Sequence, residues 1–183
     1  MIALVDCGAH IGSSIKVLQF RRAFTSIYAF EPNPVLFPVL QANLSSLANL
    51  YELHLYDAAV WIHSTGVDLY LGHPESSTLI PGKRAHPRYG VPIDYQRPVH
   101  VKSIGLSQWI HATFGIGDTV ILKMDIEGAE YEVLDQMLQE DTLRYIDELY
   151  VEWHVDRLLS ISQDVHARIK REVANRTALR PWD

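Results

Sequence analysis

Short apolar runs, each followed within three residues by an acidic residue, alternate along this chain with stretches of helical periodicity. Residues 2–5 and 26–30 are such runs, and residues 120–122 form another. Residues 51–56 instead alternate apolar and polar side chains, as a half-buried strand does. Strands that alternate with helices predict an α/β fold with a mostly parallel sheet.

Helical periodicity follows several of these runs. We expect helices over residues 34–47, 106–114 and 161–175, where apolar side chains recur at helical spacing. The Ser13-Ser14 pair stands where side chains cap a helix that follows the first strand. Residues 99–104 and 148–153 carry the pattern of further strands. One domain over residues 1–183 accounts for all of these elements.

An irregular segment interrupts the alternation at about residues 60–98. Residues 60–63 and 67–71 predict a β-hairpin around Ser64-Thr65-Gly66. Residues 72–98 are rich in proline and glycine and predict a long loop. This loop carries the basic residues Lys83, Arg84, Arg88 and Arg97, together with His86. Long loops are functional or mobile, so a substrate lid for a polar or anionic acceptor and a solvated loop are both open readings.

The run at 120–122 leads into the most acidic strand end of the chain. In an open parallel sheet, ligands bind at the carboxyl ends of the strands. Asp125, Glu127 and Glu130 follow this run closely, and they repel one another unless a cation or hydrogen-bond donors lie among them. For Glu130, a solvated position in the first helical turn, favoured by the helix dipole, is an equal alternative.

Three other strand ends carry residues suited to a nucleotide-like ligand. The turn at residues 6–12, DCGAHIG, contains glycines that let the backbone approach a ligand closely. Glu31 follows the second strand at the spacing from which a carboxylate accepts both hydroxyls of a ribose; a carboxylate ahead of an Asn33 helix cap is the alternative. Asp57 and Ala58 follow the third strand, where a small residue leaves room for a flat ring.

Composition narrows the partners that we expect. The 183 residues are 48% hydrophobic and 21% charged, and the formal net charge of -6 argues against a large nucleic-acid footprint. No apolar run approaches the roughly 20 residues of a membrane helix, and the N-terminus lacks the pattern of a secretory signal. The single cysteine, Cys7, cannot form an internal disulfide. We therefore expect a cytoplasmic protein without a membrane or nucleic-acid partner.

Four strand-end motifs taken together resemble the FkbM family of S-adenosylmethionine-dependent methyltransferases. They are VDCGAHIG (5–12), AFEPN (29–33), DAAV (57–60) and LKMDIEGAE (122–130), and EWH (152–154) is similar to the closing E-x-H of that family. KMDIEGAE is the most specific part. The resemblance implies a Rossmann-like class I methyltransferase fold, S-adenosylmethionine as cofactor, and typically methylation of a hydroxyl on a small molecule or sugar.

The residues at these strand ends suit that cofactor. Its ribose diol matches Glu31, its adenine matches the edge formed by Asp57 and Ala58, and its ammonium and carboxylate match the turn at residues 6–12. The residues that we expect to bind the cofactor are Asp6, Gly8, Ala9, His10, Gly12, Glu31, Pro32, Asp57, Ala58 and Asp125.

Methyl transfer to a hydroxyl also needs a general base. His154 is the first candidate because histidine titrates near neutrality, although a capping or surface histidine is an equal alternative. Glu127 is the second candidate, and Asp125 is expected to contact the methionine moiety or the acceptor oxygen. Lys123 stabilises a developing alkoxide or pairs with Glu127, and we favour the ion pair. These carboxylates and His154 suffice to gather a hard cation, but cofactor binding explains them without a metal.

Two departures from the family pattern leave other functions open. The fold usually finishes with two further strands, an antiparallel hairpin at the sheet edge, whereas residues 155–183 are mainly helical in pattern. We therefore expect either a truncated chain or a sheet that is naturally shorter. The chain also begins directly in its first strand, which favours an open cofactor site or a homodimer. A non-catalytic cofactor-binding module of the same fold is therefore the alternative function. An NAD-dependent oxidoreductase rests only on the glycine turn, which lacks the full GxGxxG spacing.

Overall fold

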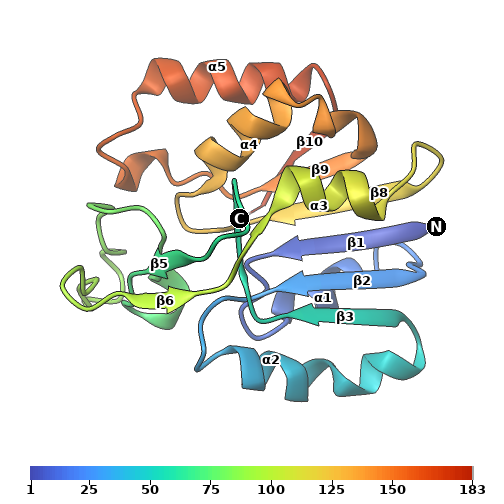
Figure 1. Cartoon of the computed structure of the whole chain (residues 1–183), viewed down its shortest axis with the longest axis horizontal. Helices are drawn as coiled ribbons and strands as arrows, with labels where there is room; N and C mark the ends of the chain where they lie inside the picture. Colours follow the sequence, from blue (N-terminus) through green and yellow to red (C-terminus); the bar gives the residue numbers. More distant parts are fainter. Residues whose placement is uncertain (183) are drawn as a thin grey trace.

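The computed structural model describes residues 1–182 and is built around a six-stranded sheet (Figure 1). The strand order is β10-β9-β8-β1-β2-β3, and every neighbouring pair is parallel. The strands are β1 (Ile2–Cys7), β2 (Ser26–Phe30), β3 (Glu52–Tyr56), β8 (Thr119–Met124), β9 (Glu148–Val151) and β10 (Ala178–Pro181). The predicted α/β fold with a Rossmann-like parallel sheet is confirmed.

Helices cover both faces of this sheet because the side chains of each strand alternate between two apolar cores. Ala3 and Val5 of β1 face one core, and Leu4 faces the other. The first core includes apolar side chains of α3 (Leu106–Thr113), α4 (Glu130–Gln139) and α5 (Gln163–Ala174). The second includes those of α1 (Ser13–Leu18) and α2 (Phe37–Leu44). The short 3₁₀ helices are η1 (Ser45–Asn49), η2 (Pro74–Ser76), η3 (Thr142–Tyr145) and η4 (Val155–Arg157).

The predicted hairpin at residues 60–71 is wrong. Strand β4 (Ala59–Trp61) pairs in parallel with β7 (Ser103–Gly105), while β5 (Val67–Leu69) pairs antiparallel with β6 (Val99–Val101). The connecting turn explains this, because its Gly66 N–H donates to Ser103 Oγ (3.0 Å) and its Ser64 hydroxyl accepts from the Gly105 N–H (2.9 Å). The turn therefore binds the returning segment, and the single strand predicted at 99–104 divides into β6 and β7.

The C-terminal part of the chain adds a strand that the helical pattern did not predict. Strand β10 pairs in parallel with β9 in the register Ala178↔Glu148 to Pro181↔Val151. It is short and ends in a proline, which is tolerated on an edge strand because proline lacks a backbone donor. Within residues 1–182 the central sheet contains no antiparallel strand, as expected from the sequence.

The start of α1 also differs from the prediction. Gly12, with φ of 88°, occupies the N-cap position, and no side chain caps this helix. The Ser14 hydroxyl instead donates to Asp6 Oδ2. A Cβ at position 12 would lie 2.7 Å from Leu44 Cδ2. The positive φ and this close contact both favour glycine at position 12, and Ser13-Ser14 is not the cap.

The strand order reverses between β1 and β8, because the chain proceeds from β1 to β3 on one side and from β8 to β10 on the other. Open α/β sheets bind ligands at this switch point. The arrows of β1, β2 and β3 in Figure 1 point toward the small β5-β6 sheet and the loop beside it. The inserted segment thus lies at the carboxyl edge of the sheet.

None of the helices formed by residues 1–182 is both long and apolar enough to cross a membrane.

Candidate active site

A cavity of about 380 Å³ lies at the switch point, at the carboxyl ends of β1, β2 and β8. This volume lies within the range of about 300–1,000 Å³ typical of small-molecule sites. The sheet side of the cavity includes Gly8, Ala9, His10, Glu31, Pro32, Ala59, Val60, Asp125, Glu127 and Glu152. The opposite wall comes from the loop at 72–98 and includes Pro74, Glu75, Ser77, Thr78, Leu79, His86 and Tyr89.

The floor of the cavity depends on Gly8. Its φ is 81°, and a Cβ at this position would lie 1.9 Å from the carbonyl oxygen of Asp125. The Asp125 N–H donates to the Cys7 carbonyl (3.1 Å), and Lys123 Nζ donates to the Gly8 carbonyl (2.8 Å). Only glycine allows the turn after β1 to pack this closely on the turn after β8. The two turns therefore form one continuous floor.

Glu31 is 6% exposed and lines the same floor. Its Oε2 accepts a hydrogen bond from the His10 N–H, and its Oε1 accepts one from the Asn33 N–H, both at 2.8 Å. Burial raises the pKa of Glu31 to about 7, although these two hydrogen bonds act in the opposite direction. Asn33 Oδ1 accepts from the Val35 N–H (3.0 Å). Asn33 thus closes a turn ahead of α2, whose N-cap is Leu36 and has no side-chain cap.

Asp6 lies beneath the floor and does not line the cavity, in contrast to the prediction. It is fully buried, and its Oδ1 lies 3.2 Å from Lys123 Nζ. Lys123 Nζ is also 3.5 Å from Asp125 Oδ2, so the favoured pair between Lys123 and Glu127 is wrong. Burial lowers the pKa of Lys123, but Asp6 and Asp125 outweigh it and raise the pKa overall. Lys123 therefore remains charged and joins the two turns from below.

His154 is fully buried, and carboxylates surround its ring. Its Nδ1 lies 2.7 Å from Oε1 of Glu130, which is itself fully buried. Its Nε2 faces Glu127 Oε2 (3.5 Å), Glu152 Oε1 (3.7 Å) and Asp125 Oδ1 (3.9 Å). Burial lowers the pKa of His154, but Glu130 and the other carboxylates outweigh it and raise the pKa overall. The structure thus brings the three predicted catalytic residues together.

Glu130 is not a solvated residue of the first helical turn. Its Oε2 accepts from the Gly128 N–H (2.9 Å), and its Oε1 accepts from the Ile126 N–H (3.2 Å) as well as contacting His154. These bonds satisfy backbone donors at the start of α4 and fix the carboxylate in place. Glu130 therefore orients the His154 ring.

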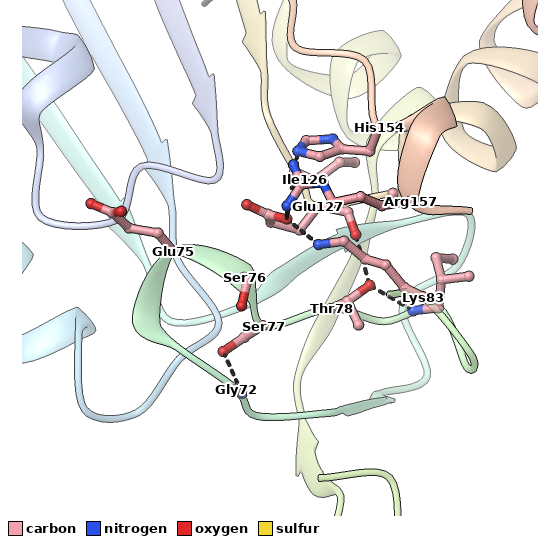
Figure 2. Close-up of polar contacts among 12 residues, drawn as sticks. Gly72, Glu75, Ser76, Ser77, Thr78, Lys83, Ile126, Glu127, His154 and Arg157 are labelled. Atoms are coloured by element: carbon pink, nitrogen blue, oxygen red, sulfur yellow. Dashed lines mark hydrogen bonds and ion pairs between the residues drawn. The ribbon is translucent and has the colours of Figure 1, made fainter. Parts of the chain in front are cut away.

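Two cations from other elements hold Glu127, whose φ of 56° is in the left-handed region (Figure 2). The buried Lys83 ammonium donates to Glu127 Oε2, and Arg157 Nη1 lies 3.4 Å from the same oxygen. The Thr78 hydroxyl donates to the Glu127 carbonyl (2.7 Å). These contacts attach the loop at 72–98 to the edge of the sheet. The reading of this segment as only a solvated loop is not supported.

Sequence reasoning missed several residues of the site. Glu152 lines the cavity, and burial, followed by the nearby Asp125, raises its pKa to about 7. The E-x-H spacing could have predicted that Glu152 lies beside His154, because residues two apart in an extended segment point to the same side. Lys83 and Arg157 gave no comparable signal, because their contacts with Glu127 join parts of the chain far apart in sequence.

The adenine prediction for the third strand end is not supported. Asp57 and Ala58 do not line the cavity, whereas the next two residues, Ala59 and Val60, do. Ala58 borders a separate shallow hollow together with His100 and Lys102. His154 likewise does not line the cavity, although Asp125, Glu127 and Glu152 beside it do. A cofactor in the cavity would therefore meet apolar side chains rather than Asp57 after β3.

The geometry of the strand ends agrees with the comparison with known families. Residues 6–170 match the family model described as the methyltransferase FkbM domain. The chain belongs to the FkbM methyltransferase family. The matched region includes the floor of the cavity, the carboxylate cluster and the loop at 72–98, whereas Trp182, which also lines the cavity, lies outside it.

The FkbM domain is also similar to a solved structure, described as the crystal structure of methyltransferase FkbM from Methylobacillus flagellatus KT. The TM-score is 0.47 and the sequence identity is 19%, over 75% of this chain. The chain spans 29% of the length of that protein. No curated protein matches the sequence.

Proposed function

We propose that this FkbM domain transfers the methyl group of S-adenosylmethionine to a hydroxyl oxygen of a small molecule or sugar. Glu31 is the observation that carries the proposal. One backbone N–H bonds each of its carboxylate oxygens, and a carboxylate oxygen accepts two hydrogen bonds. One further bond on each oxygen suits the two neighbouring hydroxyls of a ribose.

The other residues of the cavity fit the rest of the cofactor. Ala59, Val60 and Leu69 offer an apolar surface to its flat ring. Asp125 and Glu152 give the opposite part negative charge, which suits a ligand that carries a sulfonium and an ammonium group. The closely packed floor at Gly8 leaves the backbone of the turn accessible to the ligand.

In this reaction a bond forms between the acceptor oxygen and the methyl carbon, the bond from that carbon to sulfur breaks, and the hydroxyl proton leaves. When bound, the cofactor supplies the electrophilic methyl group. Holding the acceptor in line with it, at about 3–3.5 Å, supplies much of the rate. Asp125 and Glu152 line the cavity, and one of these two carboxylates accepts the hydrogen bond of the acceptor hydroxyl and then its proton as the oxygen–carbon bond forms. His154 lies behind them, so we assign it a positioning role instead of direct contact with the acceptor.

The loop at 72–98 forms the acceptor side of this proposed site. His86 and Tyr89 line the cavity, and the ring of Tyr89 stacks on His73 at 3.9 Å between centroids. Glu75 adds a carboxylate to the same wall. Aromatic rings beside hydrogen-bonding groups suit a polar acceptor with an apolar face, such as a sugar.

Calorimetry with S-adenosylhomocysteine and a methyl-transfer assay over a panel of hydroxylated acceptors test the proposal together. We expect binding to the wild-type domain and methyl transfer to at least one acceptor. Asp125→Asn should lower the transfer rate by about 10²-fold or more, because the acceptor loses a charged hydrogen-bond partner. Binding without transfer to any acceptor would favour the non-catalytic module. Failure to bind S-adenosylhomocysteine would refute the proposed cofactor.

A further inference from the structure

His154 Nε2 is a buried polar atom of the active-site edge that lacks a hydrogen-bond partner among the described residues, as do Asp6 Oδ1 and His10 Nε2. The ring is fully buried, yet this nitrogen has no hydrogen-bond partner within residues 1–182. Its carboxylate neighbours Glu127, Glu152 and Asp125 lie 3.5, 3.7 and 3.9 Å away, too far for hydrogen bonds. Native proteins seldom bury such an atom without a partner, so a group that binds both the nitrogen and the carboxylates is expected here.

We propose that this cluster is a binding site for a divalent metal ion, with His154 Nε2, Asp125 Oδ1 and Glu152 Oε1 as ligands. Ligands about 2.1 Å from an ion lie roughly 3.0 Å apart when adjacent in an octahedron and roughly 3.4 Å apart in a tetrahedron. The observed separations from Nε2 exceed these values by less than about 1 Å. The side chains of Asp125 and Glu152 are 23% and 38% exposed, so they have room to close around an ion.

Glu130 completes the arrangement from behind. A histidine that ligates a metal almost always donates its other ring N–H to a carboxylate or carbonyl oxygen. The 2.7 Å contact between His154 Nδ1 and Glu130 Oε1 places the ring hydrogen on Nδ1 and turns the lone pair of Nε2 toward Asp125 and Glu152. Backbone N–H groups already bond both oxygens of Glu130. Glu130 is therefore an orienting residue and not a ligand.

The charge balance of the cluster supports a dication. Five carboxylates meet three side-chain cations, which leaves an excess of two negative charges when His154 is neutral. The carboxylates are Asp6, Asp125, Glu127, Glu130 and Glu152, and the cations are Lys83, Lys123 and Arg157. Lys83 and Arg157 pair with Glu127, and Lys123 pairs with Asp6 and Asp125. Glu130 and Glu152 form ion-pair contacts only with His154 among the described residues, so the excess negative charge lies around the His154 ring.

The ligand set favours one class of ion. A site with one imidazole nitrogen and carboxylate oxygens suits a first-row transition dication such as Mn²⁺. Sites built from oxygens alone are typical of Mg²⁺ and Ca²⁺. Because Asp125 and Glu152 line the cavity, the ion would lie at its wall and polarise an acceptor hydroxyl. This last role, unlike the binding itself, rests on the proposed function.

Titration of the full chain with Mn²⁺ tests the site without cofactor or acceptor. Binding is measured as the loss of the free Mn²⁺ signal in electron paramagnetic resonance. We expect one Mn²⁺ per chain. His154→Asn keeps a donor near the Nδ1 position but removes Nε2, and it should weaken binding by about tenfold or more. His166→Asn is the matched control, because His166 bonds the Tyr131 hydroxyl through Nδ1 (2.8 Å) outside the cluster. It should leave binding unchanged.

Glu152→Gln provides a second test that does not depend on the buried histidine. This partly exposed side chain tolerates substitution without threatening the fold, and its loss should also weaken Mn²⁺ binding by about tenfold or more. An unchanged free Mn²⁺ signal with the wild-type chain would overturn the proposal. So would equal affinity in Glu152→Gln and wild type. Calorimetry with S-adenosylhomocysteine on the same samples separates this failure from a failure of the proposed function.

Discussion

Glu31→Gln gives the sharpest test of the proposed ribose site. The substitution preserves the size of the side chain but replaces one acceptor oxygen by an NH₂ group. Because a backbone N–H faces each oxygen of Glu31 at 2.8 Å, the new donor meets another donor whichever way the amide turns. The variant therefore loses one ribose hydrogen bond and disturbs one backbone contact.

The expected loss follows from the strength of hydrogen bonds to charged groups, about 1.5–3 kcal/mol each. A loss of about 2–3 kcal/mol corresponds to a Kd for S-adenosylhomocysteine that is roughly 30- to 150-fold higher, measured by calorimetry at pH 8. Glu140→Gln, at the exposed end of α4, is the control and should leave the Kd unchanged. A change of less than about threefold in Glu31→Gln would refute the ribose assignment.

The pH dependence of binding provides an independent check on the same carboxylate. Burial raises the pKa of Glu31 from its usual value of 4.5 to about 7, so below pH 7 the folded chain holds a proton on this carboxylate. The two ribose hydroxyls of the cofactor donate hydrogen bonds to the ionised carboxylate of Glu31. The wild-type Kd should therefore rise by about tenfold for each pH unit below 7 and level off above it. Glu31→Gln should lack this slope, and an identical slope in both proteins would contradict the assignment.

Two further substitutions test how the site is held together. Lys83→Met leaves Glu127 with Arg157 as its remaining cation and should lower the free energy of unfolding in urea by about 2–3 kcal/mol. The control Arg88→Met, at an exposed side chain, should change this free energy by less than about 0.5 kcal/mol. Equal effects of the two substitutions would show that the buried pair does not anchor the loop. Gly8→Ala should cost about 3 kcal/mol or more and abolish cofactor binding, because its Cβ would lie 1.9 Å from a carbonyl oxygen. Gly82→Ala has a similar φ of 78° but no atom within 4 Å of the new Cβ, so a cost of about 1 kcal/mol is expected in the same thermal or urea unfolding experiment; similar costs at both positions would refute the role of close packing.

The sequence predicted the fold well where the signal was local. Apolar runs located the strands at 2–5, 26–30 and 120–122, and the strand ends placed Glu31 and Asp125 at the cavity. The prediction failed where the pairing partner came from far along the chain. Residues 59–61 and 67–69 pair with residues 99–105 instead of with each other, because hydrogen bonds of residues 64–66 hold the returning segment in place.

The same limit applies to the candidate site. His154 was expected to face the acceptor, but its burial behind Asp125 and Glu152 follows from packing that no strand-end motif encodes. Lys83 appeared to be one of several loop cations, and only the folded chain distinguishes it from its exposed neighbour Arg88. The resemblance to the family thus located the edge of the site, whereas the three-dimensional contacts assigned the residues their places within it.

The attachment of the loop has a consequence for engineering. The contacts of Thr78 and Lys83 with Glu127 secure the first half of the loop, while Arg84 N–H donates to the Arg157 carbonyl (2.8 Å) and Asp94 N–H to the Leu71 carbonyl (2.8 Å). Residues 85–93 lie between these fixed points and carry His86 and Tyr89 into the cavity. This short stretch is a replaceable cassette, in which new sequences can reshape the acceptor wall while the cofactor floor and the carboxylate cluster keep their own supports.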